Sequence, residues 1–219
     1  MEFNDVVIAR RTVRRFRPEP VPEAVIADII NTGRLAASGH FAQQWRFGVV
    51  TEADLKEKLA DLCGNQSWMT TAPVIFALCL EATHEPDDEA TRQVYRDRFG
   101  RRLMDYIEAY PDRKAMNLLK RTGEALLPGQ QMFLAAANHG LRGCFIGWLD
   151  IARVNALLKL PDNLHCLFLL CVGFPYGEPD EAIHRPLSEV AFSNRWGRPW
   201  QGPSEASQES EVSTPASQR

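Results

Sequence analysis

The sequence lacks any hydrophobic run long enough to cross a membrane as a helix. Its longest apolar stretch, Cys166–Phe174, has about half of the roughly 20 residues that a membrane-spanning helix needs. Residues 1–5 are acidic and do not have the basic start and apolar core of a secretory signal. We therefore expect a cytoplasmic protein that has no membrane partner.

Several signatures of catalytic chemistry are also missing. The fourteen glycines form no G-x-G-x-x-G pattern and none is followed by lysine, which argues against a Rossmann nucleotide site and a P-loop. The five histidines show no H-E-x-x-H or other close ligand spacing, and the cysteines form no C-x-x-C pair that could complete a zinc site. Ser38 has no surrounding G-x-S-x-G motif. We expect neither a metal site nor a serine hydrolase.

The cysteines are few and do not suggest disulfides. Their number is odd, they form no C-x-x-C pair, and most lie inside apolar segments. These features predict reduced, buried thiols. The positions are Cys63, Cys79, Cys144, Cys166 and Cys171.

Charge is nearly balanced over the whole chain but not locally. The sequence has 28 Asp and Glu against 25 Lys and Arg, for a formal net charge of -3, yet residues 10–17 contain five arginines. Arginine presents a planar fork of donors that matches phosphate oxygens, and the hydroxyl of Thr12 can add a hydrogen bond. The cluster predicts a site for a small phosphorylated ligand, with a solvated basic turn as the alternative.

A nucleic-acid module that uses residues 10–17 as a basic arm is a rival from another class of protein. Binding of that kind relies on many phosphate contacts and a positive surface. The net charge of -3 disfavours it. We therefore expect no nucleic-acid partner.

The length and composition fit one folded domain with a tail. With 219 residues, of which 45% are hydrophobic, the chain can bury a sizeable core, which we assign to residues 1–200. From Gln201 onward, Gly, Pro, Ser, Glu and Gln dominate without an aromatic residue. This composition predicts a disordered tail over residues 201–219.

Hydrophobic periodicity predicts alternating helices and strands in the first third of the chain. Apolar residues recur with a period near 3.6 after Pro22, which predicts an amphipathic helix, and Trp45–Val50 is typical of a strand. Thr51 is expected to cap the next helix. Residues 73–80 are continuously apolar, as in a strand buried on both faces of a sheet.

The later elements complete an α+β pattern. Residues 84–127 are expected to form a helical excursion that acts as a lid, and an alanine-rich helix over 130–140 ends at Gly140. The remaining elements are a strand over 143–148, a helix capped by Asp150 and a strand over 165–174. Because helices and strands do not alternate strictly, we expect an α+β fold with helices packed on a sheet.

Five sequence blocks, in the same order, resemble motifs of the FMN-dependent nitroreductase family. They are Arg10–Arg14, Ala36–Phe47, Gly140–Gly147, Leu160–Pro175 and Arg185–Leu187. The resemblance covers about residues 3–200. It implies a nitroreductase-like fold with a mostly antiparallel central sheet packed by helices. It also implies a homodimer that exchanges terminal arms and shares its FMN sites between two chains.

The resemblance implies FMN as the cofactor and assigns its phosphate to the arginine cluster. Arg10, Thr12 and Arg14 fall on the family's phosphate-binding pattern, in which threonine keeps the hydroxyl of the usual serine. Arg185 falls on a late basic element that returns to the phosphate and ribityl side. Arg10 and Arg14 are therefore the pair expected to hold the phosphate.

The resemblance also implies which residues contact the flavin ring and its ribityl chain. Ser38 lies on a loop that reaches the flavin of the partner subunit in the family, and Asn65 falls on a polar contact. Ile146 and Gly147 fall where backbone N–H groups approach flavin N5. The full expected cofactor-binding set is Arg10, Arg11, Thr12, Arg14, Ala37, Ser38, Gly39, Gln43, Asn65, Ile146, Gly147 and Arg185.

Three positions of the Ser38 loop depart from the family pattern. Ala37 and Gln44 stand where proline is common, which predicts a looser loop, and Phe41 stands where asparagine is common. Phe41 and Trp68 are expected to line a substrate pocket that favours flat, apolar molecules. For Trp68, an ordinary core or interface position is the alternative.

The function that the resemblance implies is an NAD(P)H-dependent oxidoreductase. NADH or NADPH reduces bound FMN, which passes two electrons to a nitroaromatic, quinone or related acceptor by a ping-pong mechanism. No catalytic side chain is expected, because the flavin carries the chemistry. Two alternatives stay open: a specialised enzyme of the same fold, such as a reductive dehalogenase or a ring-modifying enzyme, and a flavin-binding protein without turnover.

Overall fold

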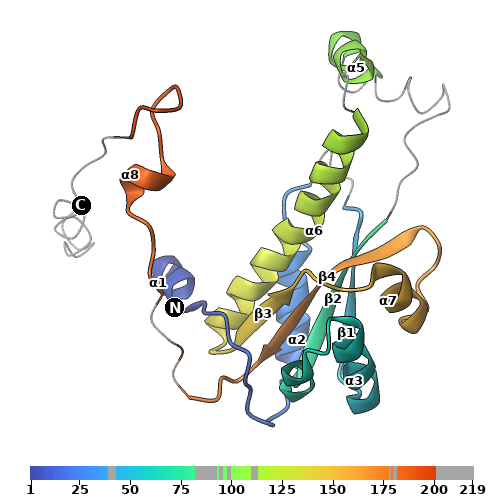
Figure 1. Cartoon of the computed structure of the whole chain (residues 1–219), viewed down its shortest axis with the longest axis vertical. Coiled ribbons are helices and arrows are strands. Elements are labelled where there is room, and N and C mark those ends of the chain that lie inside the picture. The colour runs from blue at the N-terminus through green and yellow to red at the C-terminus, as the bar shows by residue number, and fades with distance from the viewer. Residues whose placement is uncertain are drawn as a thin grey trace. The chain divides into compact units, whose positions relative to one another are not determined.

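The core of the chain is one four-stranded sheet in which all neighbouring strands are antiparallel. The computed structural model describes residues 1–38, 43–81, 93, 96–97, 100–109, 113–177, 179 and 182–200. The strands are β1 (Trp45–Val50), β2 (Val74–Glu81), β3 (Arg142–Ile146) and β4 (Leu164–Gly173). Their order in the sheet is β1-β2-β4-β3 (Figure 1). The expected antiparallel sheet of an α+β fold is confirmed.

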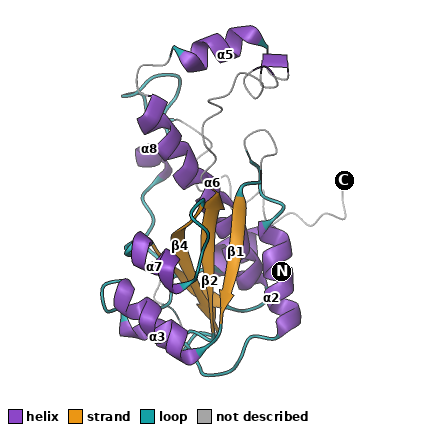
Figure 2. Cartoon of the chain, turned by 90° about the vertical axis from the view of Figure 1, so that its right-hand side faces the viewer, coloured by secondary structure: helices purple, strands orange, loops and turns teal. Residues whose placement is uncertain are grey.

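Helices cover both faces of this sheet. Figure 2 shows α3 and α7 on one side of the strands and α2 on the other, and α6 packs against α2. The helical segments are α1 (Phe3–Ala9), α2 (Glu23–Gly33), α3 (Ala53–Leu62), the 3-10 segment η2 (Ser67–Thr71), α5 (Arg101–Glu108), α6 (Arg113–Asn138), α7 (Ile151–Leu157) and α8 (Leu187–Val190).

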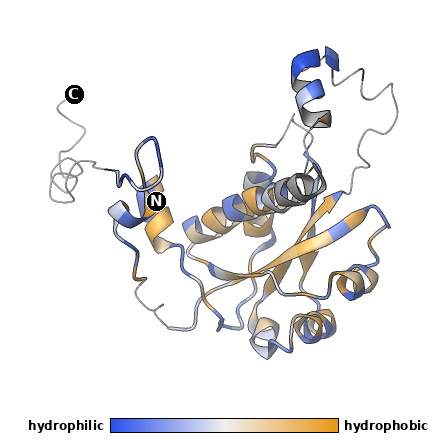
Figure 3. Cartoon of the chain, turned by 45° about the horizontal axis from the view of Figure 1, so that its top comes forward, coloured by the Kyte–Doolittle hydropathy of each residue, from blue (hydrophilic) through white to orange (hydrophobic). Residues whose placement is uncertain are grey.

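The alternation of side chains along β2 divides the core into two clusters. Seven of the eight positions of β2 are buried, as expected for a strand covered on both faces. Ile75, Ala77 and Cys79 pack in one cluster with α3 and α7, whereas Phe76 and Leu78 pack in the other with α2 and α6. Figure 3 shows the apolar character that runs along the strands.

The chain divides into two compact units, residues 1–179 and 180–219. The sheet and its covering helices belong to the first unit, and α8 belongs to the second. No described helix combines the length and the apolar character that crossing a membrane requires. The expected tail over 201–219 lies outside the described residues, as do Gly39 and Phe41 of the expected site.

The alanine-rich helix begins much earlier than expected. The structure extends α6 from Arg113 to Asn138 and includes Pro128 within it. A proline removes one helical hydrogen bond, but here tertiary packing holds the helix together. Next to it, Gly129 lies so close to the sheet that an added Cβ would be 2.5 Å from Leu78 Cδ1 and 3.0 Å from Phe145. Gly140 follows the helix with a φ of 76°.

Two further expectations about local structure need correction. Thr51 does not cap α3: the N-cap residue is Glu52, and no side-chain cap bond forms there. The helix α1 near the N-terminus, with Val6 as its buried residue, was not predicted because a seven-residue helix with a single buried position shows little periodicity. Asp150 does cap α7, accepting a hydrogen bond from Arg153 N at 3.1 Å.

Gly143 is expected to be intolerant of any side chain. A Cβ at this position of β3 would lie 2.5 Å from the backbone oxygen of Cys171 and 3.2 Å from the ring of Phe133. We predict that Gly143→Ala lowers the free energy of unfolding by about 1 to 3 kcal/mol, measured by urea denaturation. Gly123→Ala is the matched control, because a Cβ there meets nothing within 4 Å. Equal stabilities of the two variants would contradict this account of the β3–β4 contact.

Candidate functional site

The arginine-rich segment is fixed to one end of the sheet by its backbone. Thr12 forms a parallel bridge with Gly143 at the start of β3, and Val13 N donates to Gly143 O at 2.8 Å. On the other side, Arg17 N donates to Phe174 O at 2.9 Å, just beyond β4. The backbone of the segment therefore extends the sheet, while the side chains of Arg14 and Arg15 are exposed.

Three of the arginine side chains lie over aromatic rings. The guanidinium carbon of Arg10 is 5.1 Å from the ring centroid of Phe133 on α6. Arg15 lies 4.1 Å from Tyr176, and the corresponding distance from Arg17 to Phe174 is 5.3 Å. Such contacts hold a cation in place and contribute roughly 0.5 to 2 kcal/mol, depending on how far the pair is desolvated.

The remaining positions of the cluster differ in burial. Arg11 is half-buried, like Arg10, whereas Thr12 and Arg14 are exposed. Arg14 nevertheless contacts β3: burial raises the pKa of the Cys144 thiol, and the neighbouring Arg14 guanidinium partly offsets this rise. The structure thus brings Arg10, Thr12 and Arg14 together at the start of β3.

Positive charge at this end of the sheet is largely uncompensated. Within the described residues, the ion pair of the cluster is Arg17–Glu19 at 3.3 Å, with both side chains about half exposed. Arg10 and Arg14 have no carboxylate partner in the same part of the chain. Their N–H donors are therefore available to an anion, which is the chemistry that a phosphate group needs.

Ile146 and Gly147 lie at the far end of β3 from the cluster. Ile146 is buried in the core, whereas Gly147 is exposed and directly follows the strand. Gly147 is four residues beyond Gly143, which corresponds to about 13 Å along an extended strand. An added Cβ at Gly147 would be 3.5 Å from Phe168, an ordinary contact, so glycine is not required there by packing within the chain.

The Ser38 loop lies at the opposite end of the sheet from the arginine cluster. Gln43 N donates to Ser38 Oγ at 3.3 Å, and Gln44 O accepts from Glu81 N at the end of β2. Arg46 pairs with Glu81 at 2.6 Å and closes this corner. Because β2 runs from Val74 near the cluster to Glu81, about 23 Å of strand separates the two regions. One chain does not bring Ser38 and Gln43 to the arginines, and Ala37 on this loop is exposed.

Asn65 lies on the loop that follows α3. It is exposed and has a φ of 57°, a left-handed conformation that asparagine tolerates. The helix end before it is tied to the segment after Gly147, because Leu62 O accepts from Asp150 N at 3.0 Å. Asn65 therefore belongs to the same side of the molecule as the exit of β3.

Trp68, on the same connection, is half-buried against the core. Its ring centroid lies 6.5 Å from that of Phe16, with an interplanar angle of 39°. Much of the side chain is thus engaged in packing between η2 and the arginine-rich segment. The buried part of the Trp68 side chain is explained by an ordinary core position. Its expected place in the lining of a substrate pocket stays a prediction.

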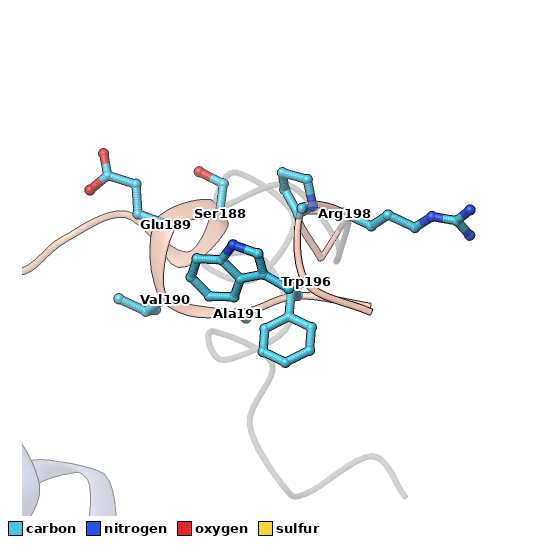
Figure 4. Close-up of a pocket in the computed structure, with 9 residues that line it drawn as sticks. Ser188, Glu189, Val190, Ala191, Trp196 and Arg198 are labelled. Atoms are coloured by element: carbon cyan, nitrogen blue, oxygen red, sulfur yellow. The ribbon is translucent and has the colours of Figure 1, made fainter. Parts of the chain in front are cut away.

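Arg185 belongs to the second unit and is exposed. This unit contains α8 and a hairpin in which Phe192 pairs with Pro199, and Figure 4 shows Trp196 beside the helix. The rings of Phe192 and Trp196 meet edge to face at 5.6 Å. They help to line a cavity of about 200 Å³ with Ser188, Glu189, Val190, Ala191, Gly197, Arg198 and Pro199. None of the expected site residues lines it.

A larger cavity, of about 650 Å³, lies between β1, α3 and the end of α7. It includes Gly48, Ala77 and Cys79 from the sheet and several leucines from the helices and the connection after α7. No residue of the expected cofactor-binding set lines this cavity either.

The structure adds two residues to the site that the sequence did not single out. Phe133 lies under Arg10, and Cys144 lies beside Arg14. Both are buried and apolar in their surroundings, so their sequence pattern is that of core residues. Only the fold brings them to the arginines, and no local signal in the sequence could have identified them.

The chain belongs to the nitroreductase family, whose family model matches residues 7–174. The NADPH-flavin oxidoreductase of Vibrio harveyi is 27% identical over 198 residues, covering 88% of this chain and 73% of that protein. The oxygen-insensitive NADPH nitroreductase of Salmonella typhimurium is 29% identical over 197 residues, with coverages of 88% and 73%. The solved structure of NADPH:FMN oxidoreductase from Vibrio harveyi complexed with NAD+ matches with a TM-score of 0.69 at 25% identity, covering 95% of this chain and 82% of that one. The expected family and fold are confirmed.

The buried thiols near the site predict a pH dependence of stability. All five cysteines are free and buried, as expected, and burial raises the pKa of the Cys63 thiol from 9.0 to about 11. Since the unfolded thiol ionises first, the contribution of Cys63 to stability is complete below about pH 9 and is lost as the pH rises through about 11.

We expect Cys63→Ala to flatten this alkaline loss of stability. The measurement is the free energy of unfolding by urea at pH 8 and at pH 10.5, for the wild type and the variant. The decrease between the two pH values should be smaller in the variant. An equal decrease in both proteins would show that Cys63 does not titrate as its burial indicates.

Proposed function

We propose that this chain holds FMN at the arginine cluster and uses it to pass two electrons from NADH or NADPH to an organic acceptor by a ping-pong mechanism. The chain is an NAD(P)H-dependent oxidoreductase of the nitroreductase family, and FMN is its cofactor. Nitroaromatics, quinones or related compounds are the acceptors we propose. When bound, the flavin supplies the redox chemistry, which is why the chain needs no catalytic side chain.

The observation that carries this proposal is that Arg10 and Arg14 are held in place without a carboxylate partner among the described residues. Both are held at the start of β3 by contacts that leave their charge without a carboxylate partner in the described residues. Thr12, which lies between them in the sequence, is exposed. This donor set fits a phosphate, and the Vibrio harveyi relative whose solved structure matches is an NADPH:FMN oxidoreductase.

The contacts proposed for the flavin ring lie along β3 and its neighbours. The exposed backbone at Gly147 can approach a ring without interference from a side chain, and Asn65 lies on the loop tied to the same segment. Ile146 contributes only its backbone, because its side chain is buried in the core. Arg11 adds a further proposed cationic contact, and Arg185 stays in the proposal from the sequence alone. Gly39 and Phe41 stay in the proposal from the sequence alone.

A homodimer with shared FMN sites follows from the position of the Ser38 loop. Within one chain, Ser38 and Gln43 lie at the other end of the sheet from Arg10, so they cannot serve the same flavin. A second copy of the chain can bring its own Ser38 loop to this site. Exposed apolar side chains on α1, namely Phe3 (71%) and Ile8 (67%), are suited to burial in such an interface.

We place the enzyme in the cytoplasm, as one folded domain over residues 1–200 followed by a tail. Five free, buried cysteines suit a reducing compartment, where disulfides are rare. The segment 84–127, which includes α5 and part of α6, is the lid that we propose over the acceptor.

Reduction of the bound flavin tests the proposed reaction. We expect the purified chain to be yellow with an FMN-type spectrum, and its absorbance near 450 nm to fall when NADH or NADPH is added without oxygen. Addition of a quinone or nitroaromatic should restore the absorbance, because the acceptor takes the two electrons from the reduced flavin and is itself reduced. A flavin-binding protein without turnover would keep its absorbance with both nucleotides, and a chain that cannot be loaded with FMN would overturn the proposal.

Complementation between two variants tests the shared site. Arg10→Ala and Ser38→Ala should each weaken FMN binding, because each removes a contact from every site. In a mixed dimer, one site carries both substitutions and the other carries neither. We therefore expect co-expressed, doubly tagged heterodimers to recover tight FMN binding at about half of their sites.

The same experiment distinguishes a site built within one chain. If Arg10 and Ser38 acted on the same chain's flavin, each site of the mixed dimer would carry one substitution and none would recover. Homodimers of each variant, taken apart and reassembled in the same way, serve as controls. Every site in them carries a substitution, so their FMN binding should stay weak. Tight binding in the Ser38→Ala homodimer would remove Ser38 from the site.

A further inference from the structure

We propose that Phe133 is a positioning residue for the cofactor, which orients the Arg10 guanidinium toward the phosphate of FMN. The inference rests on the proposed function, because it concerns the same phosphate site. Phe133 lies on α6, and it affects the binding of the phosphate group of FMN but not of the flavin ring.

The ring of Phe133 is rigidly held beneath Arg10. The side chain is 1% exposed and packs in the core cluster between α2, α6 and the sheet. Phe145 of β3 meets it edge to face, with ring centroids 5.7 Å apart and an interplanar angle of 76°. A ring fixed in this way offers one face in a constant direction, and Arg10 lies over it at 5.1 Å.

Gly143 links the ring to the backbone of the arginine cluster. Its missing side chain leaves room for the Phe133 ring, since an added Cβ would lie 3.2 Å from that ring. The carbonyl of the same residue accepts the hydrogen bond from Val13 N at 2.8 Å. One residue of β3 therefore sets both the position of the ring and the path of the chain that carries Arg10.

The ring holds the cation without occupying its donors. An aromatic face attracts a cation through its quadrupole, but it carries no negative charge and does not form the charge-assisted hydrogen bonds of a carboxylate. A carboxylate partner would engage those donors and neutralise the charge, as in the exposed pair Arg17–Glu19. Phe133 thus restricts the orientation of Arg10 while leaving its full charge and its fork of donors for a phosphate.

The end of the α1 helix restricts the backbone of Arg10. Arg10 N donates to Val6 O at 3.0 Å at the end of this helix, and Val6 is the buried residue of α1. α1 in turn packs on α6, the helix that carries Phe133. The backbone and the side chain of Arg10 are therefore both fixed before any ligand arrives, which lowers the entropic cost of binding.

This arrangement predicts an effect on FMN that riboflavin does not share. Riboflavin has the same ring and ribityl chain but no phosphate. We expect Phe133→Leu to weaken FMN binding about three- to tenfold, the range that a partly desolvated cation–π contact provides, and to leave riboflavin binding unchanged. The measurement is a fluorescence titration of the full chain with each flavin after the bound flavin is removed.

Two variants control for the loss of a buried ring. Phe76→Leu removes an equally buried ring from the same core cluster, on β2, and should leave the ratio of FMN to riboflavin affinity at its wild-type value. Phe133→Tyr keeps the aromatic face and should keep that ratio as well. If Phe133→Leu weakens both flavins equally, as a general packing defect would, the inference is overturned.

The double variant Arg10→Ala/Phe133→Leu separates this inference from the proposed function. If Phe133 acts through Arg10, the double variant should bind FMN no more weakly than Arg10→Ala alone. Additive losses would show that Phe133 acts independently of Arg10 and would overturn the inference. Unchanged FMN binding in Arg10→Ala would instead remove the phosphate from this arginine, and the proposed function's site would fail with it.

Discussion

The antiparallel pairing of β2 with β4 is the interaction on which the rest of the structure depends. β2 is apolar along almost its whole length, and its alternate side chains enter two different core clusters. A strand with two apolar faces must be covered twice, so α3 and α7 pack on one face while α2 and α6 pack on the other. A shift of one residue in this pairing would exchange the two clusters and disrupt every helix contact that they support.

The candidate site is a consequence of how this strand pair ends. β4 leaves the sheet beside the start of β3, and the missing side chain of Gly143 lets two segments approach closely there. The arginine-rich segment pairs its backbone with both strands at that corner. Five positive charges so close together repel one another, and backbone hydrogen bonds with three aromatic contacts hold them in place. The cluster is therefore placed by the sheet and not by opposite charge.

Local patterns in the sequence predicted the elements whose periodicity reflects burial. The strand Trp45–Val50, the helix after Pro22 and the cap at Asp150 follow from spacing and side-chain chemistry alone. The continuation of α6 through Pro128 does not, because contacts with the sheet outweigh the local cost of proline. The arginine cluster and its anion chemistry were visible in the sequence. Phe133 was not, because its role depends on a contact between residues 123 positions apart, and a buried phenylalanine has the same local pattern whatever lies over it.

The length of the sheet limits which residues of one chain can contact the same ligand. A single sheet of this length places Arg10 and the Ser38 loop too far apart to touch one small molecule. Either the loop has no part in cofactor binding, or it acts on a flavin held by another copy of the chain. In the second case, the loop corner closed by Arg46 and Glu81 and the arginine corner ordered by Phe133 and Gly143 are two halves of one site. On the arginine side, Arg10 is already held within its own chain by Phe133 and by the end of α1. Binding of the phosphate then costs little further ordering of Arg10, and more of the interaction energy stays available for affinity.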